Sequence, residues 1–167
     1  MIFRKLGRRH DRKQFDCGAE GVNRYLRESA RQQAEKNLAL TFVLLETDES
    51  TEIVGFYTLV MSTVACSIVP AKGLPRHQSA PVVLLAQFGV DRRFQGQGHG
   101  RRLLYHALYQ AMQAAEHAGC LAVVLDAVDE RARQFYLARG FQELTDDPHH
   151  LWLPMSAIRD MFFSQEA

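Results

Sequence analysis

Three glycines within five residues, between a strand-like and a helix-like segment, constrain this chain more than any other feature. The apolar run Val82–Leu85, continued by Phe88 and Val90, predicts a strand that Asp91 closes. Apolar residues at helical spacing after the turn predict a helix that Gly119 ends. Unpaired first-turn amides and the helix dipole favour an anion at the start of such a helix. A phosphate-bearing ligand is therefore expected at this turn, which four arginines flank: Arg92, Arg93, Arg101 and Arg102.

The turn has other interpretations. A tight connection without a ligand is about as common as an anion site, because short glycine motifs have many false positives. A P-loop requires Gly-Lys-Ser/Thr at its end, and no such triplet occurs. The dinucleotide fingerprint requires a third glycine where this chain has Arg101. A diphosphate cradle of another kind remains.

Two motifs point to a known family. Gln95-x-x-Gly98-x-Gly100 after a strand resembles the acetyl-CoA signature of the GNAT superfamily of N-acyltransferases. Phe135-Tyr136-x-x-x-Gly140-Phe141 resembles the last helix and following strand of that family. Further segments resemble the GNAT toxins of bacterial toxin–antitoxin pairs, so that the likeness extends over Phe15–Pro154: Phe15–Gly18, Val54–Leu59, Asp147–Pro148 and Leu151–Pro154.

The resemblance implies one GNAT domain over residues 1–167, of α/β (α+β) class, with a central mixed, twisted sheet flanked by helices. It implies an acetyl-CoA-dependent N-acetyltransferase, a toxin that acetylates the α-amine of aminoacyl-tRNA and inhibits translation. The partners that it implies are a small DNA-binding antitoxin of the ribbon-helix-helix type and a second copy of the chain, in a homodimer.

Acetyl-CoA offers a pyrophosphate and two pantetheine amides. By the resemblance, backbone amides between Gln95 and Arg101 take the pyrophosphate, and the strand edge Phe88–Val90 pairs with the pantetheine. Gly89 is unusual in a strand interior, where glycine marks a bulge or a close backbone approach. The cofactor-binding residues expected here are Phe88, Gly89, Val90, Gln95, Gly96, Gln97, Gly98, His99, Gly100 and Arg101.

Tyr136 is the candidate catalytic residue, since the resemblance places a tyrosine of this helix at the thioester sulfur. With a phenol pKa of about 10 and a thiol pKa of about 8.5, full proton transfer to the leaving thiolate is uphill. Hydrogen-bond stabilisation is therefore as relevant as acid catalysis. The alternative is a tyrosine that only packs beside Phe135.

The acceptor must be a neutral amine. An α-amine, with a pKa of about 8, is neutral far more often at pH 7 than a lysine amine of pKa about 10.4. Asp126, Asp129 and Glu143 are candidate general bases, although Asp129 is better explained as a helix cap. The lack of a convincing base favours an α-amine acceptor.

Charge is concentrated at the N-terminus, where residues 1–36 hold ten Lys/Arg against five acids. A helix expected from Ala19 to Lys36, capped near Asp16, carries Arg24, Arg27 and Arg31 on one side. These arginines are the candidate tRNA-binding residues, through phosphate contacts. A solvated basic face is the alternative.

One residue departs from the toxin pattern. Gln87 stands where these toxins usually have an arginine on the central strand, which puts the substrate in doubt. Two other functions therefore stay open: a GNAT that acetylates a small-molecule amine or a protein N-terminus, and a non-catalytic module that binds CoA or a partner.

The whole chain has an ordinary composition, 47% apolar and 23% charged, and no apolar run of membrane-spanning length. No signal peptide is expected, the three cysteines are too far apart for a zinc site, and we expect a cytoplasmic protein without a metal. Strands are expected at 2–6, 41–45, 53–60, 121–125, 141–144 and 150–153, helices at 129–139 and 155–163, and a surface loop at 70–81.

Overall fold

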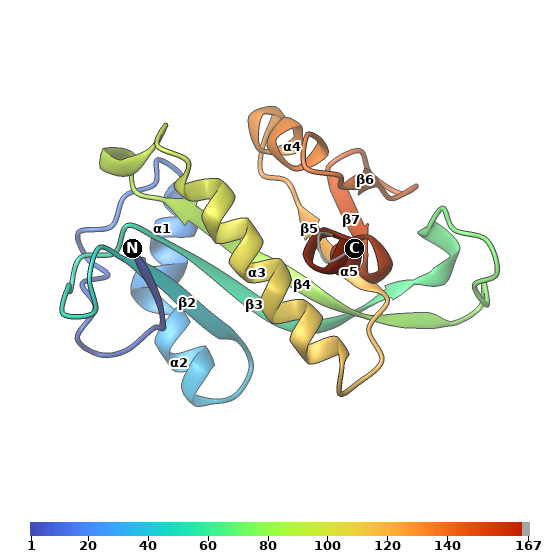
Figure 1. Cartoon of the computed structure of the whole chain (residues 1–167), viewed down its shortest axis with the longest axis horizontal. Helices are drawn as coiled ribbons and strands as arrows, with labels where there is room; N and C mark the ends of the chain where they lie inside the picture. The colour runs from blue at the N-terminus through green and yellow to red at the C-terminus, as the bar shows by residue number, and fades with distance from the viewer. Residues whose placement is uncertain (165–167) are drawn as a thin grey trace. The chain divides into compact units, whose positions relative to one another are not determined.

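A computed structural model describes residues 1–164 of the chain. Seven strands in this part form one sheet in the order β1-β2-β3-β4-β5-β7-β6 (Figure 1). The β4–β5 pair is parallel, whereas β1–β2, β2–β3, β5–β7 and β6–β7 are antiparallel. The strands are β1 Ile2–Lys5, β2 Leu40–Leu45, β3 Gly55–Ala65, β4 Ser79–Val90, β5 Ala122–Asp126, β6 Gln142–Glu143 and β7 His150–Pro154. The mixed sheet that the resemblance implied is confirmed.

Five α-helices flank this sheet in the described residues. They are α1 Glu20–Glu28, α2 Ala30–Glu35, α3 His99–Ala115, α4 Glu130–Leu137 and α5 Met155–Phe163. Two short 3₁₀ turns, Cys66–Ile68 and Arg92–Phe94, precede and follow β4. The chain divides into two compact units, Met1–Val60 with Leu85–Ala107, and Met61–Leu84 with the chain from Leu108 onward.

The first unit buries two layers of side chains on β2. Val43 and Leu45 pack with Leu26 of α1 and Ala30 of α2 on one face. Phe42 faces the other way, where its ring lies 5.2 Å from the ring of His106 on α3. This alternation follows from the two-residue period of a strand, so β2 is buried on both faces.

The second unit has its own apolar cluster. Val82 of β4, Val124 of β5 and Trp152 of β7 are all buried in it. The amide of Met155 donates to the carbonyl of Leu121 at 2.9 Å, which ties the start of α5 to the start of β5. The strand Leu121–Leu125 and its position beside the central strand were predicted correctly.

The N-terminal helix differs from the prediction, because two helices replace one and Ser29 separates them with φ −121°. Arg12 Nη1 donates to the Arg27 carbonyl oxygen at 3.2 Å, and an unbroken helix would use that acceptor for the amide of residue 31. Asp16 is also not the cap: Ala19 occupies that position, and Asp16 Oδ1 instead accepts from the amide of Gly18 at 2.9 Å.

Two other expectations are corrected. Gly119 does not end α3, which stops at Ala115, and Gly119 is not among the glycines with positive φ. The expected loop 70–81 is shorter, because β4 begins at Ser79 and includes Pro81. Proline is tolerated there since its carbonyl, and not an amide, makes the bond, accepting from Leu121 N at 2.8 Å.

Candidate active site

The glycine turn lies in the first unit, between the end of β4 and the first residue of α3. Gly96 and Gly98 have φ of 76° and 84°, the left-handed region that glycine adopts readily. A Cβ added to either residue would meet no atom within 4 Å, so the backbone borders open space. The first amides of α3 have no carbonyl four residues earlier within the helix. This geometry suits an anion approaching the backbone.

A buried carboxylate holds the start of the turn. Asp91 is 1% exposed, and its oxygens accept from Arg93 N at 3.0 Å, Arg93 Nε at 2.9 Å and Asp16 N at 3.1 Å. Burial pushes the pKa of Asp91 upward, but these hydrogen bonds and the Arg93 charge outweigh burial and hold the pKa below its ordinary value. Arg93 also pairs with Glu52. Arg93 is thus engaged by protein carboxylates.

The Gln95 side chain fastens the turn to its surroundings. Its Nε2 donates to the Val90 carbonyl at 2.9 Å and to the Cys17 carbonyl at 3.1 Å. The first residue of the acetyl-CoA signature therefore has a side chain committed to the protein. Gln95 therefore supports the shape of the turn.

His99 is the first residue of α3 and is only 7% exposed. Its ring lies 6.4 Å from the ring of Phe94, and neither ring nitrogen has a hydrogen-bond partner in residues 1–164. Burial lowers the pKa of His99, and the positive charges of Arg102 and of the chain's amino terminus lower it further. The imidazole is therefore neutral at pH 7. Next to it, the exposed Arg101 has its guanidinium 5.8 Å from the ring centre of Tyr105.

The structure explains the glycine at position 89 in β4. A Cβ on Gly89 would lie 3.1 Å from Cβ and Sγ of Cys17 and 3.3 Å from Val22. The close approach that the sequence indicated is thus made by the segment before α1. Phe88 and Val90 are half-buried at the end of the same strand.

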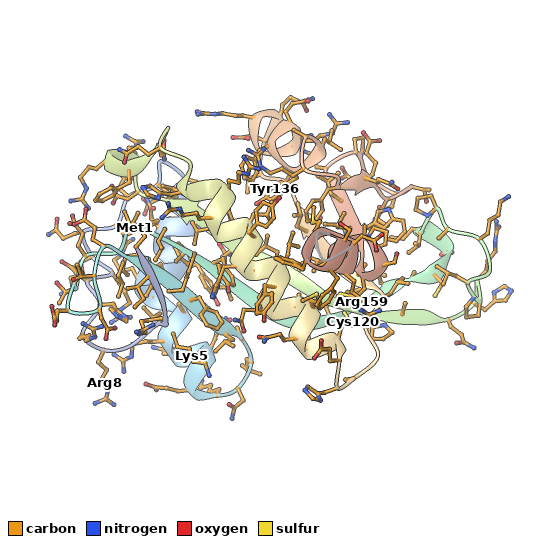
Figure 2. All side chains as sticks on the ribbon, in the orientation of Figure 1. Met1, Lys5, Arg8, Cys120, Tyr136 and Arg159 are labelled. Atoms are coloured by element: carbon orange, nitrogen blue, oxygen red, sulfur yellow. The ribbon has the colours of Figure 1, made fainter. Side chains whose placement is uncertain are left out.

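Tyr136 lies on α4 in the second unit (Figure 2). Asp129 caps this helix by accepting from the amide of Ala132 at 2.7 Å, and Gly140 follows it with φ 97°. The Tyr136 ring is 7% exposed and makes edge contacts with the rings of Phe135 and Phe141. Burial raises the pKa of Tyr136. The phenol is therefore protonated at neutral pH and can donate a hydrogen bond.

The three candidate bases differ in their surroundings. Asp129 is occupied as the cap of α4. Glu143 of β6 pairs with Arg133, which also donates to Glu130 at 2.9 Å. Asp126 is exposed at the end of β5. Of the three, Asp126 is the carboxylate that makes neither an ion pair nor a capping bond in residues 1–164.

The three arginines predicted to contact tRNA are not equivalent. Arg24 is exposed on α1. Arg27 Nη2 pairs with Glu20 at 3.2 Å, and Arg31 of α2 pairs with Glu35 at 2.9 Å. The stripe is thus divided between two helices and partly neutralised. Sequence reasoning did not identify a second basic group, formed by the segment 8–13 with Arg27, because its members converge only in three dimensions. The run of charged residues in that segment was the available signal.

Two negative findings apply to residues 1–164. No group of three or more His, Cys, Asp or Glu side chains is arranged to hold a metal ion. No helix there has the length and apolar character that crossing a bilayer requires. The thiols of Cys17, Cys66 and Cys120 are all free.

Comparison with known proteins adds an independent line of evidence. Residues 9–141 match the family model of the acetyltransferase (GNAT) family. A tRNA-acetylating toxin of Mycobacterium tuberculosis is 33% identical over 159 residues, 93% of each chain. AtaT complexed with acetyl-methionyl-tRNAfMet matches with a TM-score of 0.88 at 27% identity, over 96% of this chain and 98% of the other. A tyrosine-to-phenylalanine mutant of AtaT, bound to the C-terminus of the antitoxin AtaR, matches with a TM-score of 0.85 at 25% identity, over 97% and 98%.

Proposed function

Since this chain belongs to the acetyltransferase (GNAT) family, we propose that it is a toxin that acetylates the α-amine of aminoacyl-tRNA and so inhibits translation. The observation that carries the proposal is the full-length likeness to a tRNA-acetylating toxin, which covers the glycine turn and the α4 helix alike. The chain is an acetyl-CoA-dependent N-acetyltransferase by family. We treat residues 1–167 as a single acetyltransferase domain, of which 165–167 lie outside the described part.

Acetyl-CoA binds at the glycine turn in this proposal. The open space beside Gly96 and Gly98 supports a pyrophosphate held by backbone amides and by the dipole of α3. The end of β4 pairs with the pantetheine arm through its backbone. The residues proposed to bind acetyl-CoA are Phe88, Gly89, Val90, Gln95, Gly96, Gln97, Gly98, His99, Gly100 and Arg101. Gln95 contributes through its backbone and by holding the turn in place.

Tyr136 is the proposed catalytic residue. The bound acetyl-CoA supplies an activated thioester. The substrate amine forms the new C–N bond as the C–S bond breaks, CoA leaves as the thiolate, and the amine passes its proton to water. Tyr136 donates a hydrogen bond to the departing sulfur. The raised pKa of Tyr136 favours hydrogen bonding over complete proton transfer, because the phenol holds its proton more tightly than a thiol does.

An α-amine suits the residues better than a lysine amine. An α-amine with a pKa of about 8 needs little help from a base at pH 7, whereas a lysine of pKa about 10.4 needs a strong one. Two of the three candidate bases, Asp129 and Glu143, have structural roles, which supports an acceptor that deprotonates readily.

The proposed partners follow the relatives. Aminoacyl-tRNA is the substrate, and an antitoxin neutralises the enzyme, as the AtaT complexes with tRNA and with AtaR suggest. We further propose that the antitoxin is of the ribbon-helix-helix DNA-binding type and that the toxin is a homodimer. The tRNA is held by phosphate contacts from the basic N-terminal face, with Arg24, Arg27 and Arg31 among the contributors.

The test is transfer of labelled acetyl from acetyl-CoA to a pool of aminoacylated tRNA, with uncharged tRNA as the blank. We expect label on charged tRNA and a kcat for Tyr136→Phe lower by roughly 100-fold or more. Tyr109→Phe is the matched control, since Tyr109 is 40% exposed and its ring packs against the ring of Phe162. Full turnover by Tyr136→Phe would refute the catalytic role. If small amines or protein N-termini are labelled and tRNA is not, aminoacyl-tRNA is not the substrate and the labelled amine is.

A further inference from the structure

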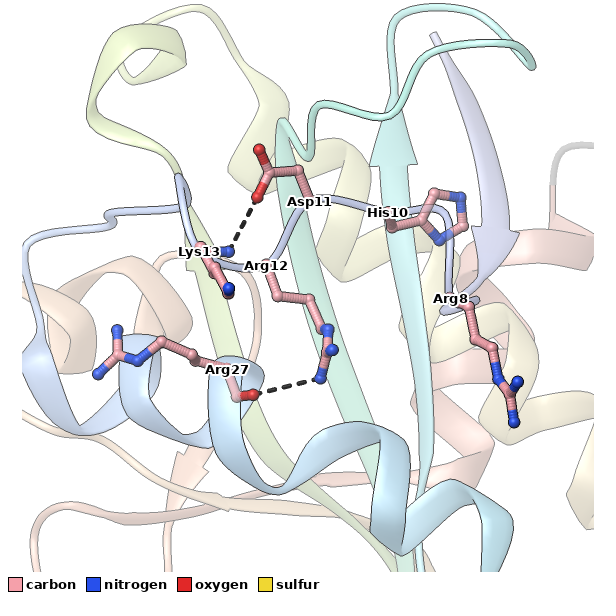
Figure 3. A pocket seen from close by; sticks show the side chains of 6 residues that line it. All are labelled: Arg8, His10, Asp11, Arg12, Lys13 and Arg27. Carbon is pink, nitrogen blue, oxygen red and sulfur yellow. Dashed lines mark hydrogen bonds between the residues drawn. The ribbon is translucent and has the colours of Figure 1, made fainter.

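A pocket of about 210 Å³ opens between the N-terminal segment and α1 in the first unit (Figure 3). It is lined by Arg8, His10, Asp11, Arg12, Lys13 and Arg27. We propose that this pocket binds one phosphate group of the RNA substrate and anchors the RNA on the enzyme. The inference rests on the proposed function, and it assigns the main phosphate contact to this pocket in place of the helical stripe.

The charge of the pocket is strongly positive. Four cationic side chains face one carboxylate. Asp11 Oδ1 turns back to its own segment, where it accepts from Lys13 N at 3.0 Å and Gln14 N at 3.3 Å. No carboxylate in residues 1–164 lies within ion-pair distance of Arg8, Arg12 or Lys13. The pocket therefore holds an excess of cations that an anion can neutralise.

Local hydrogen bonds fix the backbone beside Arg8 and the side chain of Arg12 before any ligand arrives. A turn presents Arg8: His10 N donates to the Gly7 carbonyl at 3.2 Å, and Gly7 N donates to His10 Nδ1 at 2.9 Å. Arg12 Nη1 donates to the Arg27 carbonyl at 3.2 Å, one of the unpaired carbonyls at the end of α1 (Figure 3). Ordering the Arg12 side chain beforehand lowers the entropy cost of binding.

His10 adds no charge to the pocket near neutral pH. It is 5% exposed, and burial followed by the Arg9 charge lowers its pKa, so the ring is neutral. Because Nδ1 accepts a hydrogen bond, the proton lies on Nε2, which has no partner in the described residues. Asp11 and the cations Arg8, Arg12, Lys13 and Arg27 are the other charged groups that line the pocket.

The donor chemistry favours a phosphate as the ligand. A volume of about 210 Å³ leaves room for a phosphate group. Guanidinium groups match the oxygens of a phosphate as a fork, and three of the four cations here are arginines. A continuous polyanion can place one such group in the pocket while the rest runs over the basic surface.

Equilibrium binding of uncharged tRNA across a salt series tests the pocket without requiring acetylation. Each of Arg8→Ala and Lys13→Ala removes about one cation that neutralises a phosphate, so at 0.15 M salt we expect roughly fivefold weaker binding and a salt slope smaller by about 0.7 to 0.9. Both side chains are exposed, so the fold should tolerate these substitutions. Arg159→Ala, on the exposed face of α5, is the charge-matched control (Figure 2). Acetyl-CoA affinity should be unchanged in all three variants.

The outcomes separate the pocket from the proposed function. If wild type acetylates charged tRNA but Arg8→Ala and Lys13→Ala bind tRNA with wild-type affinity and slope, the pocket assignment is overturned alone. If no tRNA is acetylated, the equilibrium binding of uncharged tRNA still tests whether the pocket binds a phosphate group of RNA. Inorganic phosphate should bind to the wild-type pocket and compete there with tRNA, and it should not do so in Arg8→Ala. Its binding is followed by ³¹P NMR. Selective loss of binding to a polyglutamate peptide, with RNA binding intact, would instead identify an acidic protein partner and overturn the proposal.

Discussion

Substituting Gly98 with alanine tests the phosphate cradle most sharply, because the chain contains a matched control. Gly98 has φ 84° and Gly73, in the loop before β4, has φ 83°. An added Cβ meets nothing within 4 Å at either position. Both substitutions therefore carry the same backbone penalty, about 1 to 2 kcal/mol for a left-handed alanine. For a chain of this size that lowers Tm by about 2 to 8 °C.

Ligand affinity should distinguish the two glycines. In the proposed cradle, the new methyl group at position 98 occupies the space that the pyrophosphate needs, and it holds the backbone amides away from the phosphate oxygens. Removing one charge-assisted hydrogen bond costs about 1.5 to 3 kcal/mol, which is roughly a 10- to 150-fold decrease in affinity. Isothermal titration of acetyl-CoA gives the affinities, and thermal melting gives the stabilities.

The two substitutions should decrease stability equally and acetyl-CoA affinity unequally. Gly98→Ala should bind acetyl-CoA at least tenfold more weakly, and Gly73→Ala should bind it as wild type does. Wild-type affinity of Gly98→Ala for acetyl-CoA would mean that this turn does not bind the phosphate. Equally weakened binding in both variants would mean that backbone strain, and not the cradle, controls binding.

Three further predictions concern the support of the turn and of α4. Gly89→Ala should lower the free energy of unfolding by about 1 to 3 kcal/mol, because its Cβ would press on Cys17 at 3.1 Å; denaturant melts measure this, and a neutral result would contradict the packing argument. Asp91→Asn should destabilise the protein at pH 7 by about 1 to 3 kcal/mol through its bonds to Arg93. Because the folded pKa of Asp91 is depressed, the carboxylate stabilises the fold above the ordinary Asp pKa of about 3.9, and this contribution is lost as pH falls through the lower folded value. The gap in Tm between wild type and Asp91→Asn should therefore close only on the acid side of that range, and a gap that closes near pH 7 would contradict the assignment. Asp129→Ala removes the cap of α4 and should cost about 1 kcal/mol, measured by thermal melting, whereas Asp126→Ala at the exposed end of β5 should not change Tm.

Local patterns predicted most elements of the fold. The Asp129 cap and the Gly140 stop delimit α4 as expected, because a cap and a left-handed glycine act within one turn of the helix. The strand beside β4, β5, was predicted from its short apolar run, because a buried strand is apolar along its whole length. The positions of Gly96 and Gly98 in an open turn agree with the motif that indicated them.

Contacts distant in sequence account for what was missed. The break at Ser29 depends on Arg12, which lies 15 residues before the Arg27 carbonyl that it occupies. The glycine at position 89 indicated a close approach, but the approaching residue, Cys17, lies on another segment and was not visible in the strand pattern. The Gln95 side chain bonds to Cys17 as well. The basic pocket combines residues 8–13 with Arg27 in the same way, so a helical stripe alone did not reveal it.

The identity of the acetylated atom tests the central claim most directly. Charged tRNA is incubated with acetyl-CoA and enzyme and digested with nuclease, and the terminal aminoacyl-adenosine is analysed by mass spectrometry. The account predicts acetyl on the α-amine of the aminoacyl group, absent with uncharged tRNA and strongly reduced with Tyr136→Phe. Unmodified aminoacyl-adenosine, produced by an enzyme that still binds acetyl-CoA, would contradict the account.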